Sequence, residues 1–249
     1  MKLQLIRHAT LWLEYGRTQF LVDPMFSDEG VNPPVINTPN DRRNPLVPMP
    51  FEMEGLLNPD AVLVTHLHPD HWDEAAIVAL SKSTPVICQL EDESAITSAG
   101  FGSVTVVNES ITSKGVTIHR TGGQHGTGEI GKRMGPVSGF VFKAAGEPTL
   151  YIAGDTIWCD DVQQALDTHQ PDITVVNAGG ARFNVGDPIT MDENDVVRVC
   201  QYAPNMKVVV VHMDAINHCL VTRADLRNRL VREGLLERVA IPEDGQWVN

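Results

Sequence analysis

Four short apolar runs in this chain are closely followed by an aspartate or a histidine, and this pattern restricts the fold more than any other feature. The pairs are Phe20–Val22 with Asp23, Val62–Val64 with His66, Tyr151–Ala153 with Asp155, and Val208–Val211 with His212. Such runs are typical of buried strands. The carboxyl ends of strands in open α/β sheets form the crevice that binds ligands, so the four polar groups are expected to meet at one edge. Taken singly, each is equally explained as a turn residue that ends a strand.

Apolar runs alternate with helical patterns along most of the chain, which predicts a mixed α/β fold with sheets covered by helices. The apolar residues at odd positions between Leu3 and Tyr15 predict an opening hairpin. Residues 104–143 are expected to form strands without helices. Residues 24–59 are rich in proline and have no strand or helix period, which is typical of a functional lid or a disordered insert. No linker is evident, so residues 1–249 are expected to form a single domain.

The charge balance excludes several classes of partner. The chain has 32 acidic and 19 basic residues, a formal charge of −13, which disfavours nucleic-acid binding. Its apolar stretches are too short to span a membrane, and its N-terminus lacks the apolar core of a secretion signal. Four cysteines without CxxC spacing are expected to be reduced thiols. We therefore expect a cytoplasmic protein with a small-molecule substrate, and a homo-oligomer is compatible with these features.

The strongest local motif places three histidines and one aspartate between His66 and His71. In an extended segment His66 and His68 point the same way, because side chains alternate along a strand. Asp73 is expected to cap the next helix, which leaves Asp70 and His71 on the turn before it. Imidazole and carboxylate without thiolate form a ligand set for Zn²⁺, Mn²⁺ or Fe²⁺. The motif therefore predicts a metal site, with spacing suited to two adjacent ions.

The motif alone cannot complete such a site, so further ligands must come from distant segments. His125 lies in a glycine-rich loop, and Asp155 and His212 follow apolar runs. His218 is an alternative to His212 if the last strand ends later than the apolar run indicates. If His218 is not a ligand, it is either a proton donor to the substrate or a structural residue.

These residues together resemble the metallo-β-lactamase-fold hydrolase superfamily over nearly the whole chain. The matching features are Thr65–His71, the distant His125, Gly154–Thr156 and His212. Three segments, His8–Thr10, Val22–Phe26 and Val208–His212, resemble the branch that contains ascorbate-6-phosphate lactonases and N-acylphosphatidylethanolamine-hydrolysing phospholipase D enzymes. The resemblance implies a four-layer αββα sandwich of two mixed sheets covered by helices, with a two-metal site at the edge between the sheets.

The resemblance also implies a division of the metal ligands between two ions. His66, His68 and His125 would hold the first ion, Asp70, His71 and His212 the second, and Asp155 would bridge them. Asp155 stands where antibiotic-hydrolysing members have cysteine, so that activity is not expected. His68 stands where flavin-diiron members have glutamate, which argues against oxygen reduction. Asp23 is expected to orient the ligands from behind, and His8 either contacts the site or forms hydrogen bonds within the hairpin.

Two adjacent ions, Zn²⁺ in the first place and Mn²⁺ or Fe²⁺ as alternatives, would lower the pKa of a bridging water to roughly 7. The resulting hydroxide would attack a small ester, lactone or phosphodiester. Asp70 and His218 are the candidate catalytic side chains, the first as a ligand and the second as a proton donor. Arg182 and Arg42 are the candidates for binding an anionic group of the substrate, because the guanidinium fork pairs with two oxygens at once.

Two rival functions fit the same residues. The first is a mononuclear iron oxidoreductase, which holds one Fe²⁺ with two histidines and one carboxylate. The second is a non-catalytic metal-binding protein on the same fold, because fold alone does not fix function. Elemental analysis separates the first rival from the hydrolase. A substrate panel separates the second.

Overall fold

The computed structural model describes residues 1–248, and over this range the chain forms two seven-stranded sheets. Across the first sheet the strands are β14 (Trp247–Val248), β1 (Lys2–Arg7), β2 (Thr10–Tyr15), β3 (Thr18–Val22), β4 (Ala61–Leu63), β5 (Val86–Cys88) and β6 (Val104–Val106). Across the second they are β13 (Val239–Ala240), β12 (Lys207–Val211), β11 (Ile173–Asn177), β10 (Leu150–Ile152), β9 (Gly139–Ala144), β8 (Val116–Thr121) and β7 (Ser110–Ser113). Strands β1–β3 and β7–β10 pair antiparallel, whereas β3–β6 and β10–β13 pair parallel. Both sheets are therefore mixed, as predicted.

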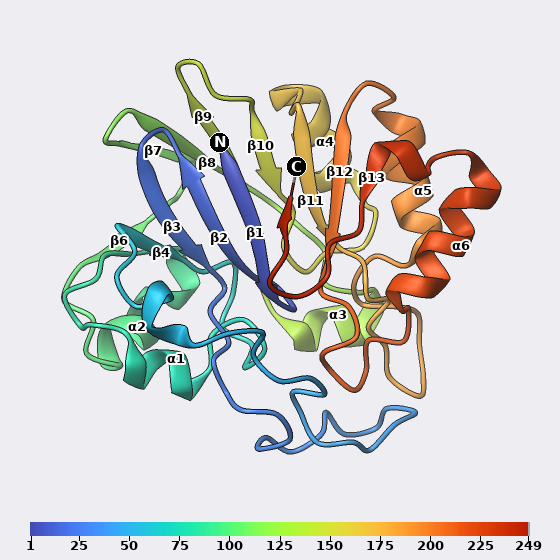
Figure 1. Cartoon of the computed structure of the whole chain (residues 1–249), viewed down its shortest axis with the longest axis horizontal. Coiled ribbons are helices and arrows are strands. Elements are labelled where there is room, and N and C mark those ends of the chain that lie inside the picture. Colours follow the sequence, from blue (N-terminus) through green and yellow to red (C-terminus); the bar gives the residue numbers. More distant parts are fainter. Residues whose placement is uncertain (249) are drawn as a thin grey trace.

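Helices cover the outer faces of the two sheets (Figure 1). The α-helices are α1 (Glu74–Ala79), α2 (Glu93–Ser98), α3 (Gly128–Met134), α4 (Asp160–His169), α5 (Glu193–Tyr202) and α6 (Arg223–Glu233). Short 3₁₀ helices are η1 (Met53–Leu56), η2 (Leu90–Asp92) and η3 (Leu236–Arg238). Helices α1 and α2 lie beside the first sheet, and α4, α5 and α6 lie beside the second. This order of layers confirms the predicted αββα sandwich. Within residues 1–248 no helix has the length and apolarity needed to cross a membrane.

Three layers of apolar side chains fill the spaces between these four layers of structure. The middle layer lies between the sheets and includes Leu3, Leu5, Leu11 and Leu13, the alternating residues of the opening hairpin. Ala76 and Ile96 belong to the layer under α1 and α2. Val162, Val196 and Leu226 belong to the layer under α4, α5 and α6. The hairpin prediction is confirmed, because its alternating face is the one that the sheets bury.

Helix α3 corrects one expectation, since residues 104–143 were expected to form strands alone. The helix contains Gly128 and Gly131, which have low helix propensity, and it buries none of its residues, so its sequence shows no apolar helical period. The proline-rich segment 24–59 has no long element either, but it is ordered by hydrogen bonds. Its Asn32 and Asn44 form a bridge, and Leu46 N donates to Ala215 O at 2.7 Å.

Candidate metal centre

The ends of β4 and α1 position the histidine motif. β4 ends at Leu63, and the extended segment after it carries His66 and His68. Asp73 caps α1 by accepting a hydrogen bond from Ala76 N at 2.7 Å, as the sequence predicted. Asp70 and His71 lie on the turn between these two elements.

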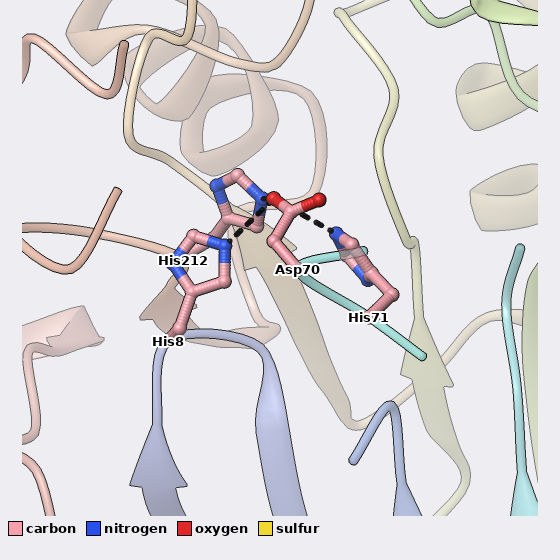
Figure 2. A group of neighbouring side chains, drawn as sticks. All are labelled: His8, Asp70, His71 and His212. Carbon is pink, nitrogen blue, oxygen red and sulfur yellow. Dashed lines mark hydrogen bonds and ion pairs between the residues drawn. The ribbon is translucent and has the colours of Figure 1, made fainter. Parts of the chain in front are cut away.

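Four further side chains reach the same edge from strands far apart in the sequence. His8 follows β1, His125 lies in the loop after β8, Asp155 follows β10 and His212 follows β12. Figure 2 shows that His8, His71 and His212 surround the carboxylate of Asp70. The predicted convergence at one edge is thus seen in the structure, and the eight side chains form two groups of four that could each hold an ion.

The first group, called the first cluster below, consists of His66, His68, His125 and Asp155, whose candidate ligand atoms all lie within 4.8 Å of one another. Nδ1 of His68 is 2.9 Å from Nε2 of His66 and 3.3 Å from Nε2 of His125. Nε2 of His125 is 3.4 Å from Oδ2 of Asp155. The three imidazoles therefore present one ring nitrogen each toward a common point.

The second cluster consists of His8, Asp70, His71 and His212. Oδ2 of Asp70 is 3.0 Å from Nε2 of His8, 3.3 Å from Nε2 of His212 and 3.8 Å from Nε2 of His71. The His8 and His212 rings are 3.7 Å apart between centroids. Of the two expectations for His8, contact with the site is the one the structure shows, because His8 stands in the second cluster itself. His212 stands there too, whereas His218 does not.

Asp155, a member of the first cluster, also faces the second cluster. Its Oδ2 is 3.3 Å from Nε2 of His71, and its Oδ1 is 3.3 Å from Nε2 of His212. Asn177 Nδ2 donates to Oδ1 at 2.6 Å and fixes the carboxylate. The sequence interpretation missed Asn177, although it ends β11 and so carries the same signal, a polar residue at a strand end, that revealed Asp155.

The imidazole rings of each cluster are oriented by contacts to the ring nitrogen that faces away from the cluster. His71 Nδ1 donates to Asp23 Oδ2 at 2.8 Å, which is the orienting position expected for Asp23. His125 Nδ1 donates to Ile189 O at 2.7 Å. His212 Nδ1 lies 3.5 Å from Sγ of Cys219, a contact that the cysteine spacing did not reveal. These bonds direct Nε2 of all three rings toward the clusters.

Three site residues adopt the left-handed backbone region that favours glycine. The φ angles are 60° at His8, 44° at Asp23 and 65° at His212. Such conformations cost on the order of 1–3 kcal/mol each and persist where the surrounding structure enforces them, commonly at functional sites. His212 N donates to His8 O at 2.8 Å, so the two strained turns of the second cluster hold each other.

Burial lowers the pKa of most clustered imidazoles, including that of His8 in the second cluster to about 3, whereas nearby carboxylates raise the pKa values of His71 and His212. Burial lowers the pKa of His125 to about 4 and holds that of His66 well below its usual value. Burial also opposes the charged form of His71, but Asp155, Asp70 and Asp23 outweigh it and raise its pKa to about 10. The pKa of Asp155 is held well below its usual value, because His212 and His71 outweigh the effect of burial.

The donor set fits divalent cations. Nε2 of His71 and Nε2 of His212 are buried without a hydrogen-bond partner among residues 1–248. Buried polar atoms without a hydrogen-bond partner are rare. An ion bound by these two nitrogens would explain them. Neutral imidazoles with carboxylates and no thiolate ligand suit Zn²⁺, Mn²⁺ and Fe²⁺.

The remaining predicted site residues lie outside both clusters. His218 is buried, with its ring centroid 6.3 Å from that of Phe183. Arg182 donates from its guanidinium to Gly186 O in its own loop at 3.2 Å, and Arg42 is exposed. Within residues 1–248 no hydrogen bond or ion pair links either arginine to the eight side chains. Their assignment to substrate binding stays a prediction.

The model of the beta-lactamase superfamily domain matches residues 18–213. The chain therefore belongs to the beta-lactamase superfamily. The UPF0173 protein YddR of Bacillus subtilis is 38% identical over 99% of this chain and 98% of its own length. A UPF0173 metal-dependent hydrolase of Cereibacter sphaeroides is 26% identical over 72% of this chain and 74% of its own length. Within the superfamily, this chain is a metal-dependent hydrolase of the UPF0173 family.

Two solved structures that are 38% identical match over the whole chain. The isothiocyanate hydrolase from Delia radicum gut bacteria is 38% identical, with a TM-score of 0.96 over 100% of this chain and 99% of that one. A possible metal-dependent hydrolase from Veillonella parvula is also 38% identical, with a TM-score of 0.97 over 100% and 98% of the two chains. The finer resemblance to ascorbate-6-phosphate lactonases and phospholipase D enzymes stays a prediction.

Proposed function

We propose that this chain is a binuclear hydrolase that activates water toward a small ester, lactone or phosphodiester. The position of Asp155 is the observation that supports this most. One of its oxygens is 3.3 Å from His71 and the other is 3.3 Å from His212, while His125 of the first cluster is 3.4 Å away. A single carboxylate that faces both clusters suits a pair of adjacent ions better than it suits a single ion.

The first cluster would hold one ion and the second cluster the other, with Asp155 shared between them. Zn²⁺ is the first candidate, and Mn²⁺ and Fe²⁺ fit the same donors. Bound ions supply a hydroxide nucleophile at neutral pH and polarise the electrophile. Asp70 and His68 are the two partly exposed members of the clusters, and the other six are buried. We infer that the substrate approaches along Asp70 and His68, while the buried residues exclude bulk water.

His218 is the proposed proton donor to the leaving group. Its Nδ1 is buried and has no hydrogen-bond partner within residues 1–248, so the atom is free to interact with a substrate. Binding of an anionic substrate group by Arg182 has weaker support, because its guanidinium already donates to Gly186 O.

Isothiocyanate hydrolysis is a second candidate, favoured by the full-length match to the isothiocyanate hydrolase. Water would add its oxygen to the central carbon of R–N=C=S, and the C–N bond would break. Both protons would go to nitrogen, so that the products are R–NH₂ and O=C=S. The same activated water serves this reaction and ester hydrolysis.

Metal analysis followed by a substrate panel tests the proposal. We expect about two divalent ions per chain, and hydrolysis of at least one class among esters, lactones, phosphodiesters and isothiocyanates. One Fe per chain with no hydrolysis would instead support the mononuclear iron oxidoreductase. Two ions per chain with no hydrolysis of any class would support a non-catalytic metal-binding protein.

A further inference from the structure

A cavity of about 500 Å³ opens beside Asp70, and we call it the Asp70 pocket. Its apolar walls come from Met25, Pro33, Val35, Trp72 and Ile216. Met25, Trp72 and Ile216 are nearly fully buried, so the floor of the pocket is rigid and apolar. The pocket therefore leads from solvent to a side chain of the second cluster along a hydrocarbon surface.

The polar groups of the Asp70 pocket do not suit a charged ligand. No Lys or Arg lines it among residues 1–248, and its ionisable groups are the carboxylates of Asp70, Asp73 and Glu74. Asp73 already accepts hydrogen bonds from three backbone N–H groups. Asp70 faces three histidines, and Glu74 lies at the exposed rim. An anion would be repelled here, and none of the three carboxylates is both buried and free to bind a cation.

The outer wall of the pocket is fixed before any ligand binds. The buried Asn217 accepts a hydrogen bond from Val35 N at 2.9 Å and donates to Val35 O at 3.1 Å. It also exchanges two hydrogen bonds with Asn44, each 2.9 Å long. Both Val35 and Asn44 line the pocket. A preformed wall of this kind reduces the entropy that binding would cost.

A second cavity offers a rival place for an apolar group. It has a volume of about 460 Å³ and is lined by Ile130, Met134, Phe183 and Val185. Unlike the Asp70 pocket, it includes Arg133 and none of the eight clustered side chains. A substituent bound in the Asp70 pocket could belong to the same substrate as an electrophile at the second cluster. This proximity favours the Asp70 pocket over the second cavity as the substrate-binding site.

We infer that the Asp70 pocket binds an uncharged hydrocarbon substituent of the substrate and so places the electrophilic carbon beside the second cluster. The inference rests on the proposed hydrolase function and narrows its substrate class. Esters and lactones with an alkyl or aryl group, or isothiocyanates with such a group, fit the pocket. A phosphodiester fits only through an uncharged alkyl or aryl arm, because its charged phosphoryl group would have to lie at the metal centre.

Alkyl hydroxamates test the pocket on the metal-loaded protein, because the hydroxamate group binds metal and the alkyl chain can enter the cavity. From acetohydroxamate to hexanohydroxamate, we expect the dissociation constant to fall about fourfold per added methylene. Ile216→Ser and the gentler Val35→Ser should flatten this dependence. Val185→Ser in the rival cavity and Val231→Ser on the exposed face of α6 should leave it unchanged.

Three results would overturn the inference. The first is an affinity that does not change with chain length. The second is a dependence abolished by Val185→Ser but kept in Ile216→Ser and Val35→Ser. The third is tighter binding of 6-aminohexanohydroxamate than of hexanohydroxamate, which would make the pocket a cation site.

A metal-independent readout separates this inference from the proposed function. Ethanol to 1-hexanol should bind metal-free protein with the same dependence on chain length, detected through Trp72 fluorescence with Trp72→Phe as control. If the alcohols and hydroxamates show the dependence but no substrate is hydrolysed, the proposed function fails alone. If substrates are hydrolysed but neither series shows the dependence, only the pocket inference fails.

Discussion

The two clusters use the same kinds of side chain but differ in what holds their imidazoles. In the first cluster, His66 and His125 are bonded to neutral groups, the Thr65 hydroxyl and the Ile189 carbonyl. In the second cluster, His71 is bonded to the carboxylate of Asp23. Burial keeps the pKa of each first-cluster imidazole below its usual value, whereas Asp155, Asp70 and Asp23 raise that of His71 in the second cluster.

This difference shows how a buried site balances its charges without an ion. The carboxylates of Asp70 and Asp155 are compensated by imidazoles of the second cluster, and so their pKa values stay well below the usual range despite burial. Divalent ions can take over the same compensation when they bind. Ion binding at the second cluster would thus replace protons on His71 and His212, whereas His8 and the rings of the first cluster are already neutral.

Asp155→Asn should have the largest effect, because Asp155 faces both clusters. We expect loss of both ions and a fall in hydrolysis on the order of a thousandfold or more. Metal content after dialysis and the initial rate measure these outcomes. Asp160→Asn, an exposed change at the start of α4, is the matched control. A variant that keeps two ions and full activity would contradict the shared role of Asp155.

A matched pair of ligand deletions separates the clusters. His8→Ala should weaken the ion of the second cluster, and His125→Ala the ion of the first, each by about 10–100-fold or more. Competition with a chelator measures the two affinities in each variant. If His8→Ala changes neither affinity, His8 orients its neighbours rather than binding an ion.

Asp23→Asn should have a smaller effect, because Asp23 touches no ion and acts through His71 and Thr65. It accepts hydrogen bonds from His71 Nδ1 and from Thr65 Oγ1, which in turn contacts His66 Nδ1. We expect a loss of about 10–100-fold in metal affinity, larger at the second cluster, because the contact with His71 is direct. Thr65→Val should instead affect the first cluster more than the second, because Thr65 contacts His66 directly and His71 only through Asp23. If Asp23→Asn lowers metal affinity equally at both clusters, then the direct contact with His71 and the indirect contact with His66 through Thr65 have the same effect.

The sequence predicted the layers and the site edge, because both depend on patterns that repeat locally. Alternating leucines and strand-end polar residues are visible in the chain itself. His8 was harder to assign, because its approach to Asp70 depends on two left-handed turns in contact, one of them at His212. Cys219 was missed for a similar reason, since its contact with His212 depends on the tertiary fold, and α3 was missed because its two glycines and lack of buried residues leave no helical pattern.

The smallest expected effect concerns a carboxylate outside both clusters. Asp92 is buried beside Gln89, which donates to its Oδ2 at 3.0 Å, and no imidazole is bonded to it among residues 1–248. Burial raises the pKa of Asp92 to about 6, the opposite of what is seen for Asp70 and Asp155. Asp92→Asn should therefore stabilise the protein at pH 7, by on the order of 1–2 kcal/mol, without changing hydrolysis.

The pH dependence of that gain distinguishes charge from packing. Between the unfolded pKa of 3.8 and the folded value of about 6, the native state binds a proton that the unfolded state has released. The stability contributed by protonated Asp92 is therefore present below this window and lost as pH rises through it. Melting temperatures of metal-free Asp92→Asn and parent protein should nearly coincide near pH 4, separate as the pH rises to about 6 and stay apart above it, while exposed Asp187→Asn shows no such separation. An equal gain at both pH values would mean that the effect comes from packing and not from charge. Asp92 could then no longer serve as the comparison which indicates that imidazoles keep the carboxylates of Asp70 and Asp155 charged.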